Sequence, residues 1–376
     1  MTSPNSRFPV RALAWLGATL MLTLASAAFA ADPYQPATYD LSALPAYVPK
    51  QRVTGVLRVY GTPLEALLGN WAEAFRGHHG QVRLNSYTVN TSQAFAGLVT
   101  GSADIGLMGH HQWRNGYQAF RAQFGYDPLE IRFGSGSYDD PKGTTPGLMF
   151  IVNKHNPLAG LTLDQIDGIF GAERTGGWVN GQWSAASARG PEKDIRTWGQ
   201  AGLTGDYATQ PVHLYGSDVT LSNWADLIER EAFHGGTKWN ADLIEAPRAD
   251  IGTKAKGKWI DQNVLEAVQE DPYAIGFIFQ RVINTYHGDV KVLPLARTAA
   301  GPFVTPSAQS FFDGSYPLHN GAYLYLNRPP GQPLGNREKE FVRFVLSREG
   351  QQILVNSRLF IPLNAAEVKA ELAKLE

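Results

Sequence analysis

Residues 56–75 read VLRVYGTPLEALLGNWAEAF, and this stretch decides the fold. Its first part is a β-branched run that predicts a strand, and Gly61-Thr62-Pro63 predicts the turn that ends the strand. Apolar residues then recur at helical spacing up to Phe75. The alternation continues with a strand from residue 82, a helix over 95–99 and a strand over 103–108. This order is typical of an α/β domain with a parallel sheet.

The rest of the chain adds elements of the same two kinds. We expect strands over 148–153, 212–215, 274–278, 290–295 and 321–327, and helices that begin near 161 with Thr162 as N-cap, contain 224–228 and run over 341–355. The stretch 171–192 is rich in Gly, Trp, Ser and Ala and is interpreted as a surface loop. The words FIVN (150–153) and LYLN (324–327) resemble each other and suggest two strands with the same role near a hinge.

The composition excludes several classes of protein. The 376 residues include 33 Lys and Arg against 34 Asp and Glu, a balance that argues against a nucleic-acid partner. With 43% hydrophobic and 18% charged residues, the chain can build a core. Cysteine is absent, which excludes disulfides, Cys-ligated zinc, iron–sulfur clusters and thiol catalysis.

The first thirty residues have the three parts of a signal peptide. Arg7 and Arg11 precede an apolar run over 12–24, and Ala28-Phe29-Ala30 offers a cleavage point. The apolar run is shorter than the about 20 residues that a spanning helix needs. We therefore expect residues 1–30 to be removed on export to the periplasm, and we expect no lipoprotein anchor because the chain has no Cys.

Many short segments, in order along residues 55–363, resemble the substrate-binding proteins of phosphate ABC transporters. These segments are GT (61–62), WAEAF (71–75), GSADIG (101–106), NP (156–157), LTL (161–163), IRTWG (195–199), LTG (203–205), DPYAIG (271–276), YPL (316–318), NRPPG (327–331) and FVRFVLS (341–347).

The resemblance implies the periplasmic-binding-protein type II fold, an α/β protein of two lobes with the ligand in the cleft between them. Each lobe would be a mainly parallel sheet flanked by helices. The implied division is a signal peptide over 1–30, an N-terminal arm over 31–54, lobe 1 over 55–155 and 290–376, and lobe 2 over 156–289.

The implied function is capture of an oxyanion, above all inorganic phosphate, and its delivery to an ABC transporter permease in the inner membrane. The protein would be a monomeric binding protein without cofactor or metal, and not an enzyme. The alternative is a family member that has lost phosphate binding and serves as a sensor or accessory protein, or that binds another anion. A hydrolase is disfavoured because neither a Gly-x-Ser-x-Gly nor a His-Glu-x-x-His motif occurs.

The implied ligand site lies where strands run into helices. Ligands of open α/β sheets bind beyond the carboxyl ends of strands, where helix N-termini offer N–H groups to anions. Hydroxyl and N–H groups are expected from Gly61-Thr62, from Thr91-Ser92 and from a third junction over 217–223. In the third junction the candidates are Ser217, Thr220, Ser222 and Asn223.

This sequence departs from the family pattern at two of these places. The family places an Asp after the third strand, where this chain has residues 107–111 without an acid, and Ser217 takes the place of a family Arg. The lost Arg removes a charge-assisted contact. A replacement cation could be His110 at low pH, Arg114, or the lysine loop over 252–259, although each is also compatible with a surface residue without a role. That loop resembles a phosphate-binding P-loop except for Trp259, which cannot hold magnesium.

Overall fold

The computed structural model describes residues 38–136, 147–179, 181–216, 219, 223–245, 260–286 and 288–376. These residues fall within one compact unit, Ala37–Glu376. The expected signal peptide (1–30) and the whole of the lysine loop (252–259) lie outside the described residues, as does the segment 137–146.

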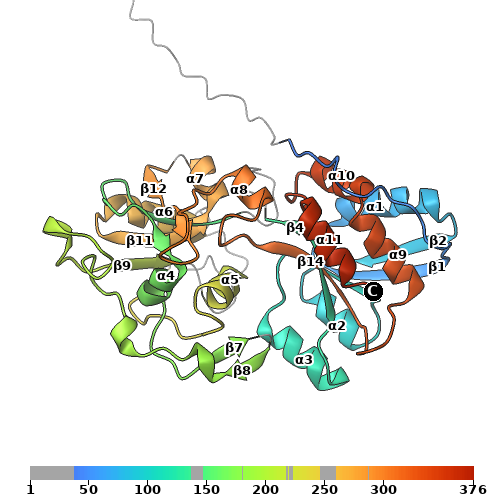
Figure 1. Ribbon diagram of the computed structural model, residues 1–376, viewed down its shortest axis with the longest axis horizontal. Coiled ribbons are helices and arrows are strands. Elements are labelled where there is room, and N and C mark those ends of the chain that lie inside the picture. The colour runs from blue at the N-terminus through green and yellow to red at the C-terminus, as the bar shows by residue number, and fades with distance from the viewer. Residues whose placement is uncertain are drawn as a thin grey trace, which may run out of the picture. The chain divides into compact units, whose positions relative to one another are not determined.

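The first sheet contains the elements that begin the chain and one strand from near its end (Figure 1). Its order is β2-β1-β3-β14-β4, with the bounds β1 Gly55–Gly61, β2 Val82–Tyr87, β3 Ile105–Met108, β4 Leu129–Ser135 and β14 Gly321–Leu326. β1 pairs in parallel with β2 and β3, whereas β14 pairs antiparallel with β3 and β4. Four strands thus share one direction, as a mainly parallel sheet requires.

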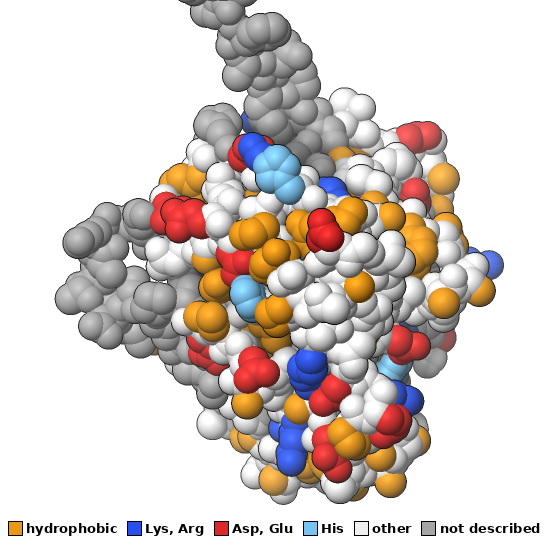
Figure 2. All heavy atoms as spheres, turned by 90° about the vertical axis from the view of Figure 1, so that its left-hand side faces the viewer, with side chains coloured by type: hydrophobic (Ala, Val, Ile, Leu, Met, Phe, Trp, Pro, Cys, Tyr) orange, Lys and Arg blue, Asp and Glu red, His pale blue; other side chains and the backbone are white. Residues whose placement is uncertain are grey.

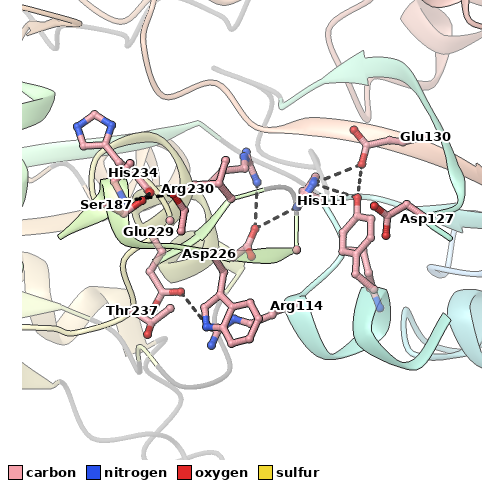
Figure 3. A pocket seen from close by; sticks show the side chains of 18 residues that line it. His111, Arg114, Asp127, Glu130, Ser187, Asp226, Glu229, Arg230, His234 and Thr237 are labelled. Atoms are coloured by element: carbon pink, nitrogen blue, oxygen red, sulfur yellow. Dashed lines mark hydrogen bonds and ion pairs between the residues drawn. The ribbon is translucent and has the colours of Figure 1, made fainter. Parts of the chain in front are cut away.

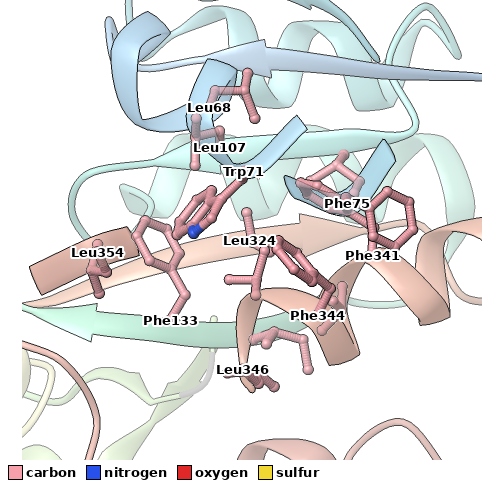
Figure 4. Close-up of a cluster of buried hydrophobic side chains, with 14 of the residues drawn as sticks. Leu68, Trp71, Phe75, Leu107, Phe133, Leu324, Phe341, Phe344, Leu346 and Leu354 are labelled. Atoms are coloured by element: carbon pink, nitrogen blue, oxygen red, sulfur yellow. The ribbon is translucent and has the colours of Figure 1, made fainter. Parts of the chain in front are cut away.

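Helices cover both faces of this sheet. One face carries α1 (Glu65–His78), α9 (Asn336–Val345), α10 (Arg348–Ser357) and α11 (Ala365–Ala373), and the other carries α2 (Gln93–Val99) and α3 (Arg114–Phe124). Side chains of β14 alternate between these layers: Leu324 and Leu326 join the first core, and Tyr323 and Tyr325 join the second. In the first core, Trp71 meets the ring of Phe133 edge-on at 5.3 Å (Figure 4).

The second sheet repeats this order with different segments. Its order is β10-β9-β11-β5-β12, with the bounds β5 Leu148–Asn153, β9 His213–Gly216, β10 Ile244–Glu245, β11 Ala274–Phe279 and β12 Val290–Val292. Around it lie α4 (Leu163–Phe170), α5 (Asn223–Glu231) and α8 (Ala308–Phe312) on one side, and α6 (Ile260–Glu270) and α7 (Gln280–Tyr286) on the other. The short strands β6 (Leu161–Thr162), β13 (Leu295–Ala296), β7 (Gly177–Val179) and β8 (Gln182–Ser184) form two further pairs.

We call the first sheet with α1–α3 and α9–α11 lobe 1, and the second sheet with β6–β8, β13 and α4–α8 lobe 2. The division expected from the sequence puts residues 148–153 and 290–292 in lobe 1, but both segments pair in the second sheet. Sheet membership favours crossings between β4 and β5 and between β13 and β14, and a division into domains stays a proposal.

The resemblance of FIVN to LYLN corresponds to equivalent places in the two sheets. β5 and β14 are each the fourth strand, and each runs antiparallel to both of its neighbours. Ile151 pairs with Gly276 of β11, and Tyr325 pairs with Gly106 of β3. The two strands therefore occupy equivalent positions in their sheets, and their common role near a hinge stays a prediction.

Two local expectations were wrong. The helix expected over 341–355 is two helices, because Ser347 ends one and caps the next by accepting a hydrogen bond from the Gly350 N–H at 3.2 Å. The loop expected over 171–192 contains the β7–β8 hairpin and two buried arginines, Arg174 and Arg189. The N-cap expected at Thr162 is confirmed, as part of a capping box with Gln165.

Charges of both signs share the surface of lobe 2. Figure 2 faces this side of the molecule, and its coloured Lys and Arg side chains are interspersed with Asp and Glu. This distribution agrees with the balanced composition and does not resemble the basic face of a nucleic-acid-binding protein.

Candidate functional site

The ends of β1 and β3 and the turn before α2 bring two of the expected site residues together. The Thr62 hydroxyl lies 3.2 Å from the Thr91 hydroxyl and accepts a hydrogen bond from the Gly109 N–H at 3.0 Å. Thr62 is only 8% exposed, whereas Thr91 is half-buried. The sequence thus identified two hydroxyls that do converge.

Gly61 makes this convergence sterically feasible. Its φ is +146°, and a Cβ atom there would lie 1.9 Å from the backbone oxygen of Leu107. Because backbone cannot move aside, only glycine fits. A hydrogen bond joins the ends of β1 and β3 at this point, because the Thr62 N–H donates to the Leu107 carbonyl at 2.9 Å.

The turn before α2 offers fewer donors than a free helix N-terminus. The N–H groups of Gln93 and Ala94 donate to the carbonyls of Asn90 and Thr91, each at 3.1 Å. The exposed Ser92 is the N-cap residue, but its side chain makes no capping hydrogen bond. The anion-binding capacity of this junction therefore rests on hydroxyls more than on the helix N–H groups.

The third expected junction lies mostly beyond the described residues. Ser217, Thr220 and Ser222 are outside them, and Asn223 is placed only as the first residue of α5. The structure therefore neither joins these residues to Thr62 and Thr91 nor separates them.

His110 does not have the properties of the replacement cation. Its ring lies 4.7 Å from that of Trp113, and its Nδ1 lies 2.7 Å from the backbone oxygen of His111. Burial, the largest influence, lowers the pKa of His110 below its usual value of 6.5. At any given pH the charged form of His110 is therefore rarer than that of a free imidazole, which weighs against the predicted role of His110 as a cation at low pH.

A cavity of about 820 Å³ has walls from both lobes (Figure 3). The residues that line it do not include the described candidates from the sequence, which are Gly61, Thr62, Thr91, Ser92, His110 and Asn223. Lobe 1 contributes residues from the start of α3 and from β4, and lobe 2 contributes α5 and the β7–β8 hairpin. Its charged and aromatic lining comprises His111, Arg114, Tyr117, Asp127, Glu130, Trp178, Asp226, Glu229, Arg230 and His234.

His111 sits between carboxylates of the two lobes. Its Nε2 lies 3.3 Å from Oε2 of Glu130 on β4, and its Nδ1 lies 3.3 Å from Oδ2 of Asp226 on α5. The hydroxyls of Tyr117 and Tyr325 also donate to Glu130. Burial raises the pKa of Glu130, but these contacts outweigh burial and lower it to about 2.

Arg114 makes a second contact between the lobes. Its guanidinium lies 3.5 Å from Oε2 of Glu229 on α5 and 5.8 Å from the ring centre of Trp178 on β7. Burial raises the pKa of Glu229 to about 7, against the opposing effects of Trp239 and Arg114. Arg114 therefore contacts lobe 2 across the cleft, and a role for it in binding stays a prediction.

The sequence did not identify His111, Glu130, Asp226 or Arg230 as site residues. Arg230 binds Asp226 at 3.0 Å and Glu231 at 3.2 Å, and it lines the cavity as a permanent positive charge. Asp226 and Arg230 are one helical turn apart on α5, which is a visible signal. Their partner His111 is 115 residues away from Asp226, and no local pattern indicates it.

Two negative findings apply to the described part of the chain. Within it, no cluster of three or more His, Asp or Glu side chains is arranged to hold a metal ion. Within it, too, every helix is too short or too polar to cross a membrane.

Comparison with known proteins assigns the class. Residues 50–349 match a family model described as the PBP superfamily domain, so the chain belongs to this superfamily. The two sheets with their flanking helices are consistent with that assignment.

Particular relatives narrow the comparison. The chain is 29% identical over 352 residues to the phosphate-binding protein PstS of Pseudomonas aeruginosa PAO1, an alignment that covers 93% of this chain and 94% of the relative. It is 23% identical over 297 residues to the protein SphX of Synechococcus elongatus, covering 78% and 73%. The crystal structure of PstS from Borrelia burgdorferi is similar in fold, with a TM-score of 0.50, 13% identity and coverage of 82% of this chain and 99% of that one.

Proposed function

We propose that this protein is a periplasmic solute-binding protein that captures inorganic phosphate for an ABC-type importer. The observation that carries the proposal is the similarity to a phosphate-binding protein over 93% of the chain. Like the phosphate-binding relative, the protein is a binding protein and not an enzyme. The alternative of a relative that has lost phosphate binding is not favoured by these comparisons.

The proposed binding mode places the anion against the hydroxyls of Thr62 and Thr91, beside Gly61 and Ser92. The 3.2 Å separation of the two hydroxyls supports it, because one hydroxyl of this hydrogen-bonded pair donates to the other and leaves the second O–H group to donate to an anion oxygen. The junction over 217–223 would approach from lobe 2. Arg230 of α5 is a further cation on the lobe 2 side, where it lines the cavity and pairs with Asp226 and Glu231.

The remaining parts of the proposal concern the protein's surroundings. Residues 1–30 would direct export and be removed, and the mature protein would act as a soluble monomer without cofactor. Its partner would be a permease in the inner membrane, with cleft closure as the signal for delivery. Intact leader on the purified exported protein would contradict the first point.

Calorimetric titration with inorganic phosphate tests the function directly. We expect saturable binding, and we expect Thr91→Ala with Ser92→Ala to weaken it about fivefold for each neutral hydrogen bond lost, or about 1 kcal/mol each. Thr100→Ala is the matched control, because Thr100 follows the same helix and donates to the Ala96 carbonyl at its other end. An unchanged affinity in the double variant would remove the site assignment.

Competition with sulfate tests selectivity in the same assay. Residues 107–111 contain no acid that could repel a fully ionised anion, so we expect phosphate and sulfate to differ less than in a strict phosphate binder. If neither phosphate nor sulfate binds, the proposed function is contradicted.

A further inference from the structure

His111 is the residue of the cavity that has a carboxylate of each lobe at hydrogen-bonding range. One ring nitrogen faces Glu130 of lobe 1, and the other faces Asp226 of lobe 2, both at 3.3 Å. The His111 side chain is 19% exposed, and the two carboxylates are 29% and 21% exposed, so solvent screens these contacts only partly. Figure 3 shows the ring between the two acids.

The chemistry of imidazole makes this arrangement sensitive to protonation. A neutral ring has one N–H group and one acceptor nitrogen, whereas a protonated ring has two N–H groups. Only the protonated ring can donate to both carboxylates, and the neutral ring leaves one carboxylate facing a lone pair.

Other groups packed around His111 act on it in both directions. Tyr117 from α3 lies 3.1 Å from Nε2, and Tyr323 from β14 meets the ring edge-on at 5.6 Å. Burial and the charge of Arg230 lower the pKa of His111, but hydrogen bonds to Asp226 and Glu130 outweigh them and raise it. Arg230 acts from a distance and is itself paired with Asp226, whereas Asp226 contacts the ring directly.

We propose that His111 is a proton-dependent clasp between the lobes: its imidazolium, held by Glu130, binds Asp226 when the cleft is closed and loosens that hold when it deprotonates. Closing then takes up a proton, because the closed arrangement adds a second carboxylate to the ring. Retention of the solute should therefore be strongest at mildly acidic pH and weaken as the pH rises through the pKa of His111. The clasp rests on the proposed function, since it acts on the retention of a bound solute.

The dissociation rate of inorganic phosphate between pH 5.5 and 8.5 tests the clasp. Phosphate itself titrates in this range, so the informative quantity is the difference between wild type and variants. We expect the rate to rise more steeply with pH in wild type than in His111→Gln and in Asp226→Asn. His78→Gln is the matched control, because His78 pairs with Glu349 at 3.0 Å entirely within lobe 1, and its profile should follow wild type. Superimposable profiles for all four proteins would overturn the proposal.

Glu229 requires its own variant, because its pKa of about 7 lies in the same range and its partner Arg114 is in the other lobe. Glu229→Gln should change the phosphate dissociation rate by a similar factor at every pH. Its rate should still rise with pH more steeply than the rate of His111→Gln. If Glu229→Gln alone removes the pH dependence, the clasp is not at His111.

A measurement without ligand separates this proposal from the proposed function. We expect the closed arrangement, with Asp226 against the ring, to be populated without phosphate as well. The pKa of His111, followed by NMR of its imidazole, should therefore be lower in Asp226→Asn than in wild type. Circular dichroism of each variant shows whether it is folded. If phosphate does not bind at any pH, the function fails but this titration still decides the clasp. An unchanged His111 titration in a folded Asp226→Asn protein would overturn it.

Discussion

The two sheets share a strand order, yet equivalent positions in them serve different ends. In each, the third strand has a glycine against which a helix packs: Gly106 of β3 lies under α2, and Gly276 of β11 lies under α6. A Cβ atom would come within 3.1 Å of Leu98 at the first and 2.8 Å of Val264 at the second. Opposite these glycines, lobe 1 has Tyr325 and lobe 2 has Ile151.

The difference between Tyr325 and Ile151 shows that only the first sheet uses this position to line up groups beside the cavity. The Tyr325 hydroxyl donates to Glu130 at 2.9 Å and accepts from the Gln112 N–H at 3.0 Å, which ties β14 to the wall of the cavity. Ile151 contributes only to a buried apolar cluster. In lobe 2 buried charges hold the neighbourhood of the cavity instead: Arg174 donates to the carbonyls of Ser187, which lines the cavity, and of Phe233.

The largest expected effect comes from those buried charges. Arg174, 3% exposed, binds both oxygens of Asp167 at 2.7 Å, whereas Arg58 and Asp104 in lobe 1 form a pair that is 43% and 13% exposed. Removing one partner of a buried pair costs about 3–5 kcal/mol, against at most about 1 kcal/mol for a partly exposed pair. Because Arg189 also contacts Asp167, we expect Arg174→Ala to cost about 3 kcal/mol in urea unfolding and Arg58→Ala at most about 1 kcal/mol. Equal losses would show that the lobes do not differ in this respect.

A smaller effect is expected at the glycines that end the second strand of each sheet, Gly61 of β1 and Gly216 of β9. Alanine at Gly61 meets the Leu107 carbonyl with φ at +146°, whereas alanine at Gly216 meets the Phe277 ring at 2.5 Å, and a ring can shift. We expect Gly61→Ala to cost about 2–3 kcal/mol and Gly216→Ala about 1 kcal/mol in thermal unfolding. Phosphate affinity should fall only in Gly61→Ala, since Thr62 would be displaced; a loss of the same size in both would contradict this.

The smallest effect, and the one that bears most directly on β14 and β5, concerns Tyr325 and Ile151. Tyr325→Phe should cost about 1–2 kcal/mol, because Glu130 and the Gln112 N–H lose a partner, and Ile151→Val should cost about 1 kcal/mol.

The pH dependence distinguishes these two losses. The folded-state pKa of Glu130 is lowered from 4.5 to about 2, so the stability it contributes is present above 4.5 and lost as the pH falls towards 2. The deficit of Tyr325→Phe should shrink over that range, and the deficit of Ile151→Val should stay constant. A constant deficit for both would mean that Tyr325 acts only through packing.

Much of the fold could be predicted because its signals are local. The strands at 56–60 and 148–153 are β-branched or apolar runs, and the helix after Pro63 has a clear apolar stripe. Missed elements have weaker signals: β4 reads LEIRFGS, with Glu130 and Arg132 interrupting the apolar pattern. Glu130 lines the cavity and Arg132 pairs with Glu367 of α11, so the polar contacts of these two residues obscured the strand.

The site could be predicted only in part, because only some of its residues have a local signal in the sequence. Thr62 and Thr91 stand at strand-to-helix junctions, a position that marks them in the sequence. Of the adjacent histidines, His110 attracted attention, but its neighbour His111 is the one that faces carboxylates. Neighbouring residues in an extended segment point apart, and which of the two faces the cavity depends on partners far along the chain.

The late position of β14 also sets the order in which the molecule can be completed. All strands of the second sheet lie between Leu148 and Val292, whereas the first sheet waits for Gly321–Leu326, through which β4 joins it. In a chain that emerges N-terminus first, all strands of the second sheet are therefore available before β14, the partner of β3 and β4, has emerged. Until β14 arrives, β3 has an open edge, the kind of edge that invites pairing with other chains. The N-terminal half of this protein thus depends for its solubility on the arrival of residues near the other end.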